Sequence, residues 1–479
     1  MRHRQFRRGL ARGSGRFGVS EGRTVEQARG DRDRHPRVGR TGGARQARRA
    51  RAARAAGAAV ALLVASVAGY PPLSARTAAP VPPDVVLVVV DALRADRLSL
   101  YGYGRPTTPA LERRRSELRW FTDATAASTQ TVPSVAALLT GRPPRLHWIQ
   151  YDPATNSFPP YGESPRFDTR FVTLSETFGE AGYDTRAIVG NPWLTEATRF
   201  DRGFSKFEGW KIWDRNGVND DEAMVVAAKA YLSAPSKRPR FLYLHLMGVH
   251  NPYDKGHRQF VRGTGVVRYL NGRVEASRED TDYMSDLYDS NVAFVDGLLG
   301  GLIDRLTAPN GNRPALVCVV GDHGDEFQEH GGFGHGTTVY HELARVPVLF
   351  WGPGIVTRYG PSAYPLELPD VRAILLALAG VSPNRLDGLV SKRASEPAFP
   401  SPSFRSIELY HEKAVYQKPW KYIVTTSPFG ERLFNLQKDP AEKVDRSAAE
   451  PRVLARLRAV AQGWWPDIAY PQPATAGSR

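Results

Sequence analysis

Cysteine is nearly absent: the 479-residue chain contains only one, Cys318. A single cysteine excludes a disulfide within the chain and a zinc site built from cysteines. Cys318 stands inside an apolar run, which predicts an inert core residue. The rest of the composition is that of a folded globule, with 41% hydrophobic, 10% aromatic and 24% charged residues, and this excludes wholesale disorder.

Acidic residues are scarce at the N-terminus. Residues 1–55 contain 17 arginines, no lysine and only four acids, a net charge of +13. The other residues hold 48 basic and 45 acidic side chains, so they contribute only +3 to the formal charge of +16. The basic charge therefore belongs to an arm, residues 1–54, that we predict to be disordered. Because the body is nearly neutral, no nucleic-acid partner is expected.

No apolar run reaches the roughly 20 residues that a membrane-spanning helix needs. Residues 55–70 (AAGAAVALLVASVAGY) lack charge, follow the arginine-rich arm and end at two prolines. This pattern predicts a secretory signal or a single N-terminal membrane anchor, and a buried alanine-rich helix is the alternative. An arginine-rich flank stays cytoplasmic, so we expect the body to be extracytoplasmic: secreted, periplasmic or membrane-anchored.

Apolar, β-branched runs recur along the body and predict strands buried on both faces of a parallel sheet. They are residues 84–90, 184–189, 241–246, 315–320 and 346–351. Helices are predicted between them at residues 108–118, 133–139, 173–181, 220–232 and 283–306. This alternation predicts an α/β fold with a doubly wound, mostly parallel sheet flanked by helices. In such sheets the functional residues gather at the carboxyl ends of the strands.

The C-terminal region has a different pattern. Residues 414–424 and 431–436 predict a hairpin in a small antiparallel subdomain, and a helix is predicted at 451–462. The chain therefore divides into a catalytic domain, residues 84–390, and a C-terminal subdomain, residues 391–470.

Three segments place reactive side chains at strand ends and at a helix start. Asp91 follows the first predicted strand, and Asp322-His323 follows the strand at 315–320. Thr131 stands just before Pro133, which suits the first position of a helix, where an anion is favoured. Carboxylates and an imidazole facing a hydroxyl predict a divalent-metal site that activates the hydroxyl towards an anionic ester. Helix capping is the structural alternative for Asp91 and Thr131.

The residues around these motifs resemble the sulfatase-like branch of the alkaline phosphatase superfamily, across residues 84–447. The similar stretches are VVLVVVDALRADRLSLYGYGRPTTP, TVPSVAALLTGR, FLYLHLMGVHNPY, GDHGDEFQEHGGFGHG, RVPVLFWGPGI and the late KYIV with LFNLQKDPAE. Six stretches in the family's order make the resemblance specific. It implies the fold of that superfamily and a metal-dependent enzyme of ester hydrolysis or group transfer.

The resemblance also implies roles for single residues. Metal ligands are implied at Asp91, Thr131, Asp322 and His323. Thr131 stands where sulfatases have the cysteine that becomes formylglycine and where phosphoethanolamine transferases have threonine. His250 matches a histidine that contacts the transferred group or protonates the leaving oxygen. His335 occupies a position that is lysine in many sulfatases and histidine in the transferases.

The metal is expected to be zinc, calcium or manganese, with zinc favoured because His323 and other histidines are present. Four further residues near the metal motif are expected to play lesser parts. Asp325 is expected to be solvated, and Glu326, Glu329 and His330 are expected to be structural or to support the metal ligands.

Three departures from the sulfatase pattern bear on the reaction. Ala92 replaces a second aspartate, Val135 replaces an arginine, and the segment 190–193 (Gly-Asn-Pro-Trp) lacks the lysine and histidine of its counterpart. Threonine cannot become formylglycine, so a phosphoryl or phosphodiester reaction through a covalent Thr131 adduct fits these residues better.

The predicted function is a sulfatase-family hydrolase that cleaves a sulfate or phosphate ester, including diesters and phosphonates, with Thr131 as nucleophile and His250 or His335 as the acid. Its substrate would be an anionic ester on a glycan, a lipid headgroup or a small molecule. One alternative is a phosphoethanolamine-transferase-like enzyme that moves a phospho-headgroup. Another is a catalytically dead sulfatase-fold protein that binds an anionic glycan.

Overall fold

The computed structural model describes residues 81–147, 170–215, 218–256, 258–265, 268–270, 273–307, 313–356, 358–382 and 404–470, which all belong to one compact unit. The predicted arm, the apolar segment 55–70 and the predicted boundary near residue 391 lie outside these ranges. Among the helices described, none combines the length and the apolar character needed to cross a membrane. The predicted export segment and extracytoplasmic location stay predictions.

An eight-stranded sheet lies at the centre of this unit, in the order β15-β2-β14-β11-β1-β8-β4-β5. The strands are β1 (Asp84–Val90), β2 (Leu118–Phe121), β4 (Asp184–Val189), β5 (Lys206–Glu208), β8 (Arg240–Leu246), β11 (Ala315–Gly321), β14 (Val348–Trp351) and β15 (Gly360–Ser362). All neighbours pair in parallel except β14, which is antiparallel to both β11 and β2. The predicted mostly parallel, doubly wound sheet is confirmed.

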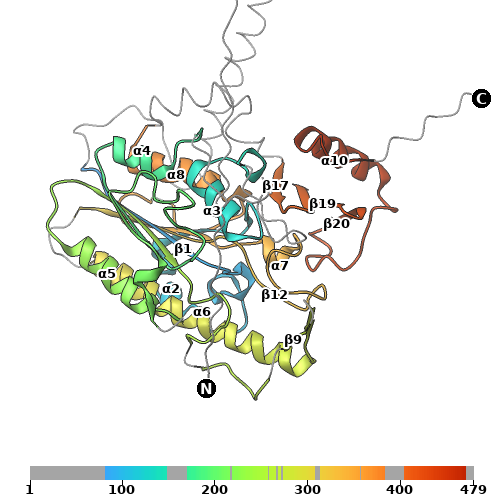
Figure 1. Cartoon of the computed structure of the whole chain (residues 1–479), viewed down its shortest axis with the longest axis horizontal. Coiled ribbons are helices and arrows are strands. Elements are labelled where there is room, and N and C mark those ends of the chain that lie inside the picture. Colours follow the sequence, from blue (N-terminus) through green and yellow to red (C-terminus); the bar gives the residue numbers. More distant parts are fainter. Residues whose placement is uncertain are drawn as a thin grey trace, which may run out of the picture. The chain divides into compact units, whose positions relative to one another are not determined.

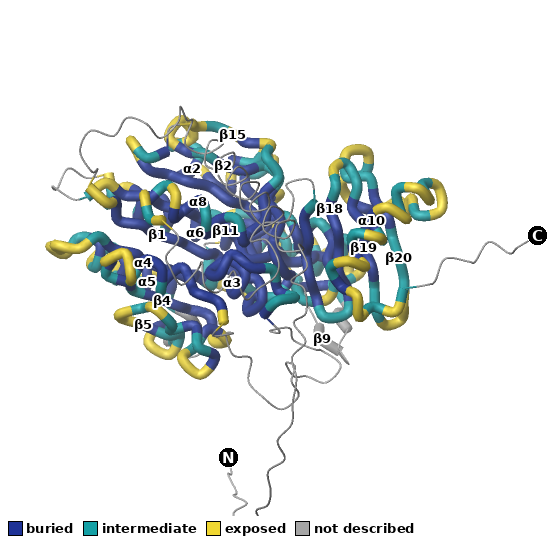
Figure 2. The backbone as a smooth tube through the Cα atoms, turned by 90° about the horizontal axis from the view of Figure 1, so that it is seen from above, coloured by how far each residue is buried: buried dark blue, intermediate teal, exposed yellow. Residues whose placement is uncertain are grey.

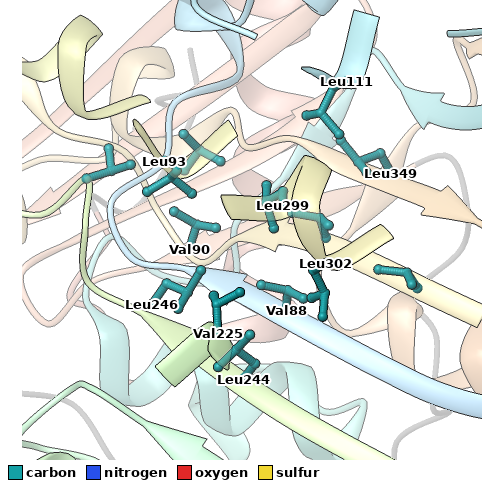
Figure 3. Packing of buried hydrophobic residues seen from close by; sticks show 14 of the residues in the cluster. Val88, Val90, Leu93, Leu111, Val225, Leu244, Leu246, Leu299, Leu302 and Leu349 are labelled. Carbon is teal, nitrogen blue, oxygen red and sulfur yellow. The ribbon is translucent and has the colours of Figure 1, made fainter. Parts of the chain in front are cut away.

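Helices cover both faces of this sheet (Figure 1). One face carries α3 (Thr131–Thr140), α4 (Leu174–Glu180) and α8 (Asp370–Ala379), and the other carries α2 (Pro109–Glu112), α5 (Asp221–Ser233) and α6 (Arg278–Thr307). Side chains of β1 alternate between the two layers, with Val85, Leu87 and Val89 on the α3 side and Val86, Val88 and Val90 on the α6 side. Figure 3 shows Val88 and Val90 packed among leucines of β8 and α6. Burial on both faces explains the unbroken apolar sequence of β1.

The predicted helix at 108–118 is wrong over most of its length. Only Pro109–Glu112 is α-helical; a 3-10 turn follows at Arg115–Glu117, and β2 begins at Leu118. β2 pairs with β14, with Trp120 opposite Leu349. The aromatic pair in β2 is buried in the sheet, and this long-range pairing overrides the local helical pattern.

Helix α3 begins at Thr131, two residues before the predicted start at Pro133. Pro133 is therefore the third helical residue. Its missing N–H still costs no intrahelical hydrogen bond, because the first four N–H groups of a helix have no partner within the helix. Gly141 ends the helix with a positive φ of 67°. This start places the Thr131 side chain at the helix N-terminus.

A second sheet follows at the C-terminus. It is antiparallel, in the order β17 (Arg405–Glu408), β18 (Glu412–Gln417), β19 (Trp420–Thr426) and β20 (Phe429–Asn435), and α10 (Pro451–Trp464) follows it. The predicted antiparallel character and helix are present. The prediction treated residues 414–424 as one strand of a hairpin. In the structure they belong to two strands, β18 and β19, joined by a turn at Lys418-Pro419.

The C-terminal sheet is covered on both faces. One face packs against α10, where Tyr422 and Leu433 contact Leu457 and Ala461. The other face packs through Ile407, Ala414 and Ile423 on Val339, Ala344 and Val346, which precede β14. Figure 2 shows β18 and β19 as largely buried segments, like β1 and β11 in the central sheet. The C-terminal sheet is thus part of the same packed body as the strand ends that carry the predicted site.

Candidate functional site

Two neighbouring strands and one helix bring the predicted metal ligands together. β1 and β11 are parallel, with Val90 opposite Gly321, so the residues that follow them emerge at the same edge of the sheet. These residues are Asp91 after β1 and Asp322-His323 after β11, and all three side chains are fully buried. Thr131, also buried, reaches them from the first turn of α3.

The reactive atoms of these four residues face one another. Thr131 Oγ1 lies 3.2 Å from His323 Nε2 and 3.4 Å from Asp91 Oδ2. His323 Nε2 lies 3.6 Å from Asp91 Oδ1 and 3.5 Å from Asp322 Oδ2. One atom from each of Asp91, Asp322 and His323 falls within a group spanning less than 4.8 Å. The structure therefore brings together the four residues that the sequence pointed to.

The polarity of this cluster suits a cation. His323 Nδ1 lies 3.0 Å from the Gly324 carbonyl oxygen, which can only accept, so Nδ1 carries the proton and Nε2 presents a lone pair to the carboxylates. Asp91 Oδ1 and Asp322 Oδ2 are buried and have no hydrogen-bond partner among the described residues. Two carboxylates, an imidazole lone pair and a hydroxyl converge, and buried charge of this kind needs a counter-charge. These residues fit a divalent metal ion.

The electrostatics of the cluster lead to the same conclusion. Burial and the charge of Asp91 raise the pKa of Asp322. Burial opposes ionisation of Asp91, but the hydrogen bond from His245 and the charges of His250 and His323 hold its pKa well below the ordinary value. Burial and the nearby positive His335 lower the pKa of His323 to about 4. His323 is therefore neutral at pH 7 and available as a ligand, and a cation beside Asp322 would favour its ionised form next to Asp91.

Two residues that sequence reasoning missed hold Asp91 in place. Asn191 Nδ2 donates to Asp91 Oδ2 at 2.7 Å, and His245 Nε2 lies 3.0 Å from the same oxygen. The Trp193 N–H donates to Asn191 Oδ1, which orients the amide, and the Tyr243 hydroxyl lies 2.8 Å from His245 Nδ1. In the sequence, Asn191 stands out only as a departure from the sulfatase pattern. For His245, the signal in the sequence was its place among apolar residues near the end of β8.

His335 is paired with a carboxylate that was expected to be solvated. Its Nδ1 lies 2.6 Å from Asp325 Oδ1, and the Tyr253 hydroxyl donates to Asp325 Oδ2 at 2.6 Å. Asp325 is fully buried, so the expectation of a solvated side chain is wrong: His335 and Tyr253 replace the water. Burial alone would lower the pKa of His335, but the charge and hydrogen bond of Asp325 raise it to about 9. His335 is therefore a cation at neutral pH.

The two predicted catalytic histidines lie side by side. The ring centres of His250 and His335 are 5.0 Å apart, and His335 lies 4.4 Å from the ring of His323. His250 Nδ1 is 2.8 Å from the carbonyl oxygen of Asn251, so Nδ1 carries a proton there and Nε2 is the other ring nitrogen. A positive His335 beside the Thr131 cluster is suited to binding an anionic group and protonating a leaving oxygen.

An α/β sheet with aspartate and aspartate-histidine at two neighbouring strand ends, facing a hydroxyl at a helix start, is the arrangement of the alkaline phosphatase superfamily. Within it, the chain belongs to the sulfatase family, whose model, described as Sulfatase, matches residues 83–381. Enzymes of this family are metal-dependent, and the cluster at Asp91, Asp322 and His323 agrees with that property.

Relatives of the chain include both transferases and sulfatases. It is 26% identical over 286 residues to the phosphatidylethanolamine transferase Mcr-2 of Escherichia coli, covering 58% of this chain and 50% of that protein. It is 24% identical over 432 residues to the delta 4,5-hexuronate-2-O-sulfatase of Bacteroides thetaiotaomicron, covering 79% and 88%. The chain spans about half the length, or less, of the bacterial transferases it matches.

Solved structures share the fold. The phosphonate monoester hydrolase of Agrobacterium radiobacter superposes with a TM-score of 0.61 at 17% identity, covering 80% of this chain and 96% of that one. At this identity the likeness shows the fold alone. The relatives act on sulfate or phosphate esters or move a phospho-headgroup, and the choice between these reactions depends on the site.

Proposed function

We propose that the protein is a metal-dependent ester hydrolase that cleaves a phosphorus ester with Thr131 as its nucleophile. The observation that carries the proposal is the hydroxyl of Thr131 at the centre of the Asp91–His323 cluster. Threonine has no route to the formylglycine that sulfatases use. A phosphothreonine or phosphonothreonine adduct, in contrast, can be resolved by attack of water at phosphorus. A sulfate ester is the less favoured substrate.

Asp91, Thr131, Asp322 and His323 would hold the divalent cation. Zinc is favoured over calcium and manganese because His323 presents an imidazole lone pair. Bound there, the ion would offset the charge of the ester oxygens and lower the pKa of the Thr131 hydroxyl. Asn191 and His245 keep Asp91 oriented by bonding to Oδ2 and leave Oδ1 without a partner among the described residues.

The residues of the chain divide the reaction between them. Thr131 Oγ1 attacks phosphorus in line and loses its proton towards Asp91 Oδ2, the carboxylate oxygen beside it that is not assigned to the ion. The N–H groups of Thr131 and Val132, which have no acceptor within the helix, would face the anion. His335 donates the proton from Nε2 to the leaving oxygen, because Asp325 holds Nδ1. Neutral His335 then takes a proton from water, which attacks the adduct and restores Thr131. His250, beside His335, is the second candidate for the acid.

Transfer to an acceptor hydroxyl is the second candidate function. The same residues would then pass a phospho-headgroup from Thr131 to the acceptor instead of to water, and the relationship to Mcr-2 favours this version. The anionic ester, on a glycan, a lipid headgroup or a small molecule, remains a proposal in both cases. A catalytically dead binding protein is the least favoured candidate, because the Thr131 hydroxyl, the cluster of Asp91, Asp322 and His323, and the His335–Asp325 pair lie together.

A panel of aryl substrates tests the proposed reaction. We expect the metal-loaded protein to hydrolyse an aryl phosphate monoester, phosphodiester or phosphonate ester at least about 100-fold faster than the aryl sulfate, by kcat/KM. Release of the aryl alcohol with equimolar phosphate, phosphate monoester or phosphonate, according to the substrate, indicates hydrolysis, whereas product that appears only with an added alcohol acceptor indicates transfer. Faster turnover of the aryl sulfate would contradict the preference for phosphorus.

The pH dependence tests the role of His335. Since the pKa of His335 is raised to about 9, its acid form persists through neutral pH, and kcat should fall as pH rises through about 9. Asp325→Asn removes the charge that raises this pKa, while burial still lowers it. The alkaline limb of the kcat profile should then shift by roughly two units towards neutral pH. Asp467→Asn, an exposed carboxylate in the C-terminal region, is the control. An unmoved limb in Asp325→Asn would remove His335 from the acid role.

A further inference from the structure

A second group of metal-type ligands lies on the segment that carries His335. Its members are Glu326 at the start of β12 (Glu326–Phe327), His330 in the turn before β13 (Phe333–Gly334) and Glu342 in α7 (His341–Ala344). One ligand atom from each falls within a group spanning less than 4.8 Å. None of the three belongs to the Thr131 cluster, and the sequence pointed only to structural or supporting parts for Glu326 and His330.

The imidazole of His330 is oriented as a metal ligand would be. Its Nε2 lies 3.3 Å from the carbonyl oxygen of Glu442, which can only accept, so Nε2 carries a proton. Its Nδ1 lies 2.6 Å from Glu342 Oε1, a hydrogen-bond distance, so a proton lies between these two atoms. The ring stacks on Tyr340, with centres 3.5 Å apart and planes within 2° of parallel, which fixes its direction.

Glu326 supplies an oxygen without a partner. Its side chain is fully buried, and Oε1 accepts from the backbone N–H groups of His330 at 2.8 Å and Gly332 at 2.7 Å. Oε2 has no hydrogen-bond partner in the described part of the chain. A Cβ atom at Gly332 would come within 2.5 Å of Oε2, so only glycine leaves room for the carboxylate there. A buried carboxylate oxygen left unpaired is unfavourable unless a cation binds it.

Two permanent cations that border the group pair with other acids. Arg94 pairs with Asp96 and Glu329 at 2.8 and 2.7 Å, and Lys421 pairs with Glu442 at 2.7 Å. A third, Lys443, donates to the carbonyl oxygen of Glu329, and among the described residues Glu326 accepts from the backbone N–H groups of His330 and Gly332. A divalent cation in place of the His330 proton would balance both carboxylates.

We propose that Glu326, His330 and Glu342 bind a zinc ion, separate from the ion at the Thr131 cluster, that fixes the fold of the 326–342 segment. An imidazole nitrogen and two carboxylates are ligands that zinc accepts. Binding releases the proton held between His330 Nδ1 and Glu342 Oε1. Because the ligands come from both ends of the segment, the ion ties β12 to α7 and holds His335 and its partner Asp325 in position. The proposal does not depend on the reaction catalysed.

Measuring the number of zinc ions bound per full-length chain tests this site. In Asp91→Asn/Asp322→Asn, the first ion loses two ligands, and after dialysis against Zn²⁺ we expect one zinc per chain and a rise in Tm on adding Zn²⁺. Adding Glu326→Gln to this variant should lower the remaining zinc affinity by at least about 100-fold and abolish the Tm rise. Glu222→Gln, an exposed glutamate of α5, is the matched control and should keep the zinc.

His330→Gln in the same background provides a second test in case Glu326→Gln fails to fold. It keeps a polar side chain of similar size but removes the imidazole lone pair, so we again expect loss of the zinc. The proposal is overturned if the double variant holds no zinc. It is also overturned if zinc remains bound in whichever of the Glu326→Gln and His330→Gln variants fold.

Discussion

Thr131→Ala should lower kcat/KM for a phosphorus ester by about 10⁴-fold or more, equivalent to about 5.5 kcal/mol of transition-state stabilisation. The change removes the hydroxyl that lies between Asp91 Oδ2 and His323 Nε2 and introduces a residue that favours the helix. Thr307→Ala, at the exposed end of α6, removes a threonine hydroxyl outside the site and should leave turnover unchanged. Steady-state rates on the best phosphorus ester measure the difference.

The covalent adduct gives this prediction a second readout. Quenching the wild-type reaction in acid during turnover should leave a phosphoryl or phosphonyl group on the peptide that contains Thr131, visible by mass spectrometry. With the aryl sulfate we expect little turnover. A sulfothreonine has no aldehyde to regenerate, so its sulfate can be released only by attack of water at sulfur. If that peptide is unmodified and turnover persists in Thr131→Ala, another group is the nucleophile.

Asp322→Asn should abolish activity together with metal binding at the Thr131 cluster while the fold remains. Loss of one charged ligand should lower the affinity of the cluster for the metal ion by at least about 100-fold, equivalent to about 2.7 kcal/mol of binding free energy. The metal-free variant should be at least as stable as the metal-free wild type, because the exchange removes both the cost of burying the Asp322 charge and its repulsion from Asp91, which together raise the pKa of Asp322. Asp91→Asn should behave in the same way towards metal and activity.

Metal content and thermal unfolding, each with and without added metal, check this result. Asp467→Asn again serves as the control for losing an aspartate charge. The expected pattern is one metal equivalent fewer per chain, a smaller rise in Tm on adding metal, and no activity. Full activity in Asp322→Asn or Asp91→Asn without added metal would contradict the assignment of these residues as ligands.

The long strands of the sheet were predictable from the sequence because their burial on both faces leaves an unbroken apolar run. β1 and β11 were found in this way, and so was β8 apart from Arg240 and His245. β4 was found from its apolar second half, because Asp184 and Arg186 are only partly buried. β2 was not, because four residues at its position, Leu118–Phe121, are stabilised as a strand by pairing with β14 more than two hundred residues later. A local pattern does not contain that partner, so the helical periodicity before it was extended too far.

The residues of the candidate site also divide into those that the sequence predicts and those that depend on long-range pairing of strands. Asp91, Asp322 and His323 were predictable because a polar residue directly after a buried strand stands out in sequence. Asn191 and His245 were not, because their contact with Asp91 depends on β8 lying beside β1, and β4 beside β8, in a particular register. Asp325 was misjudged for a related reason. Its partners, Tyr253 and His335, come from different loops, and neither is visible from the acidic segment itself.

The contact between the C-terminal sheet and the residues before β14 limits how this protein can vary. Lys421 of β19 donates to the carbonyl oxygen of Val339 at 2.7 Å, and Glu442 accepts from the backbone N–H of His341 at 2.6 Å. The chain between His335 and β14 is therefore held from outside the catalytic strands. A premature stop codon before β17, or recombination that exchanges the C-terminal sheet between relatives, would change the active-site loop without altering any residue that touches substrate.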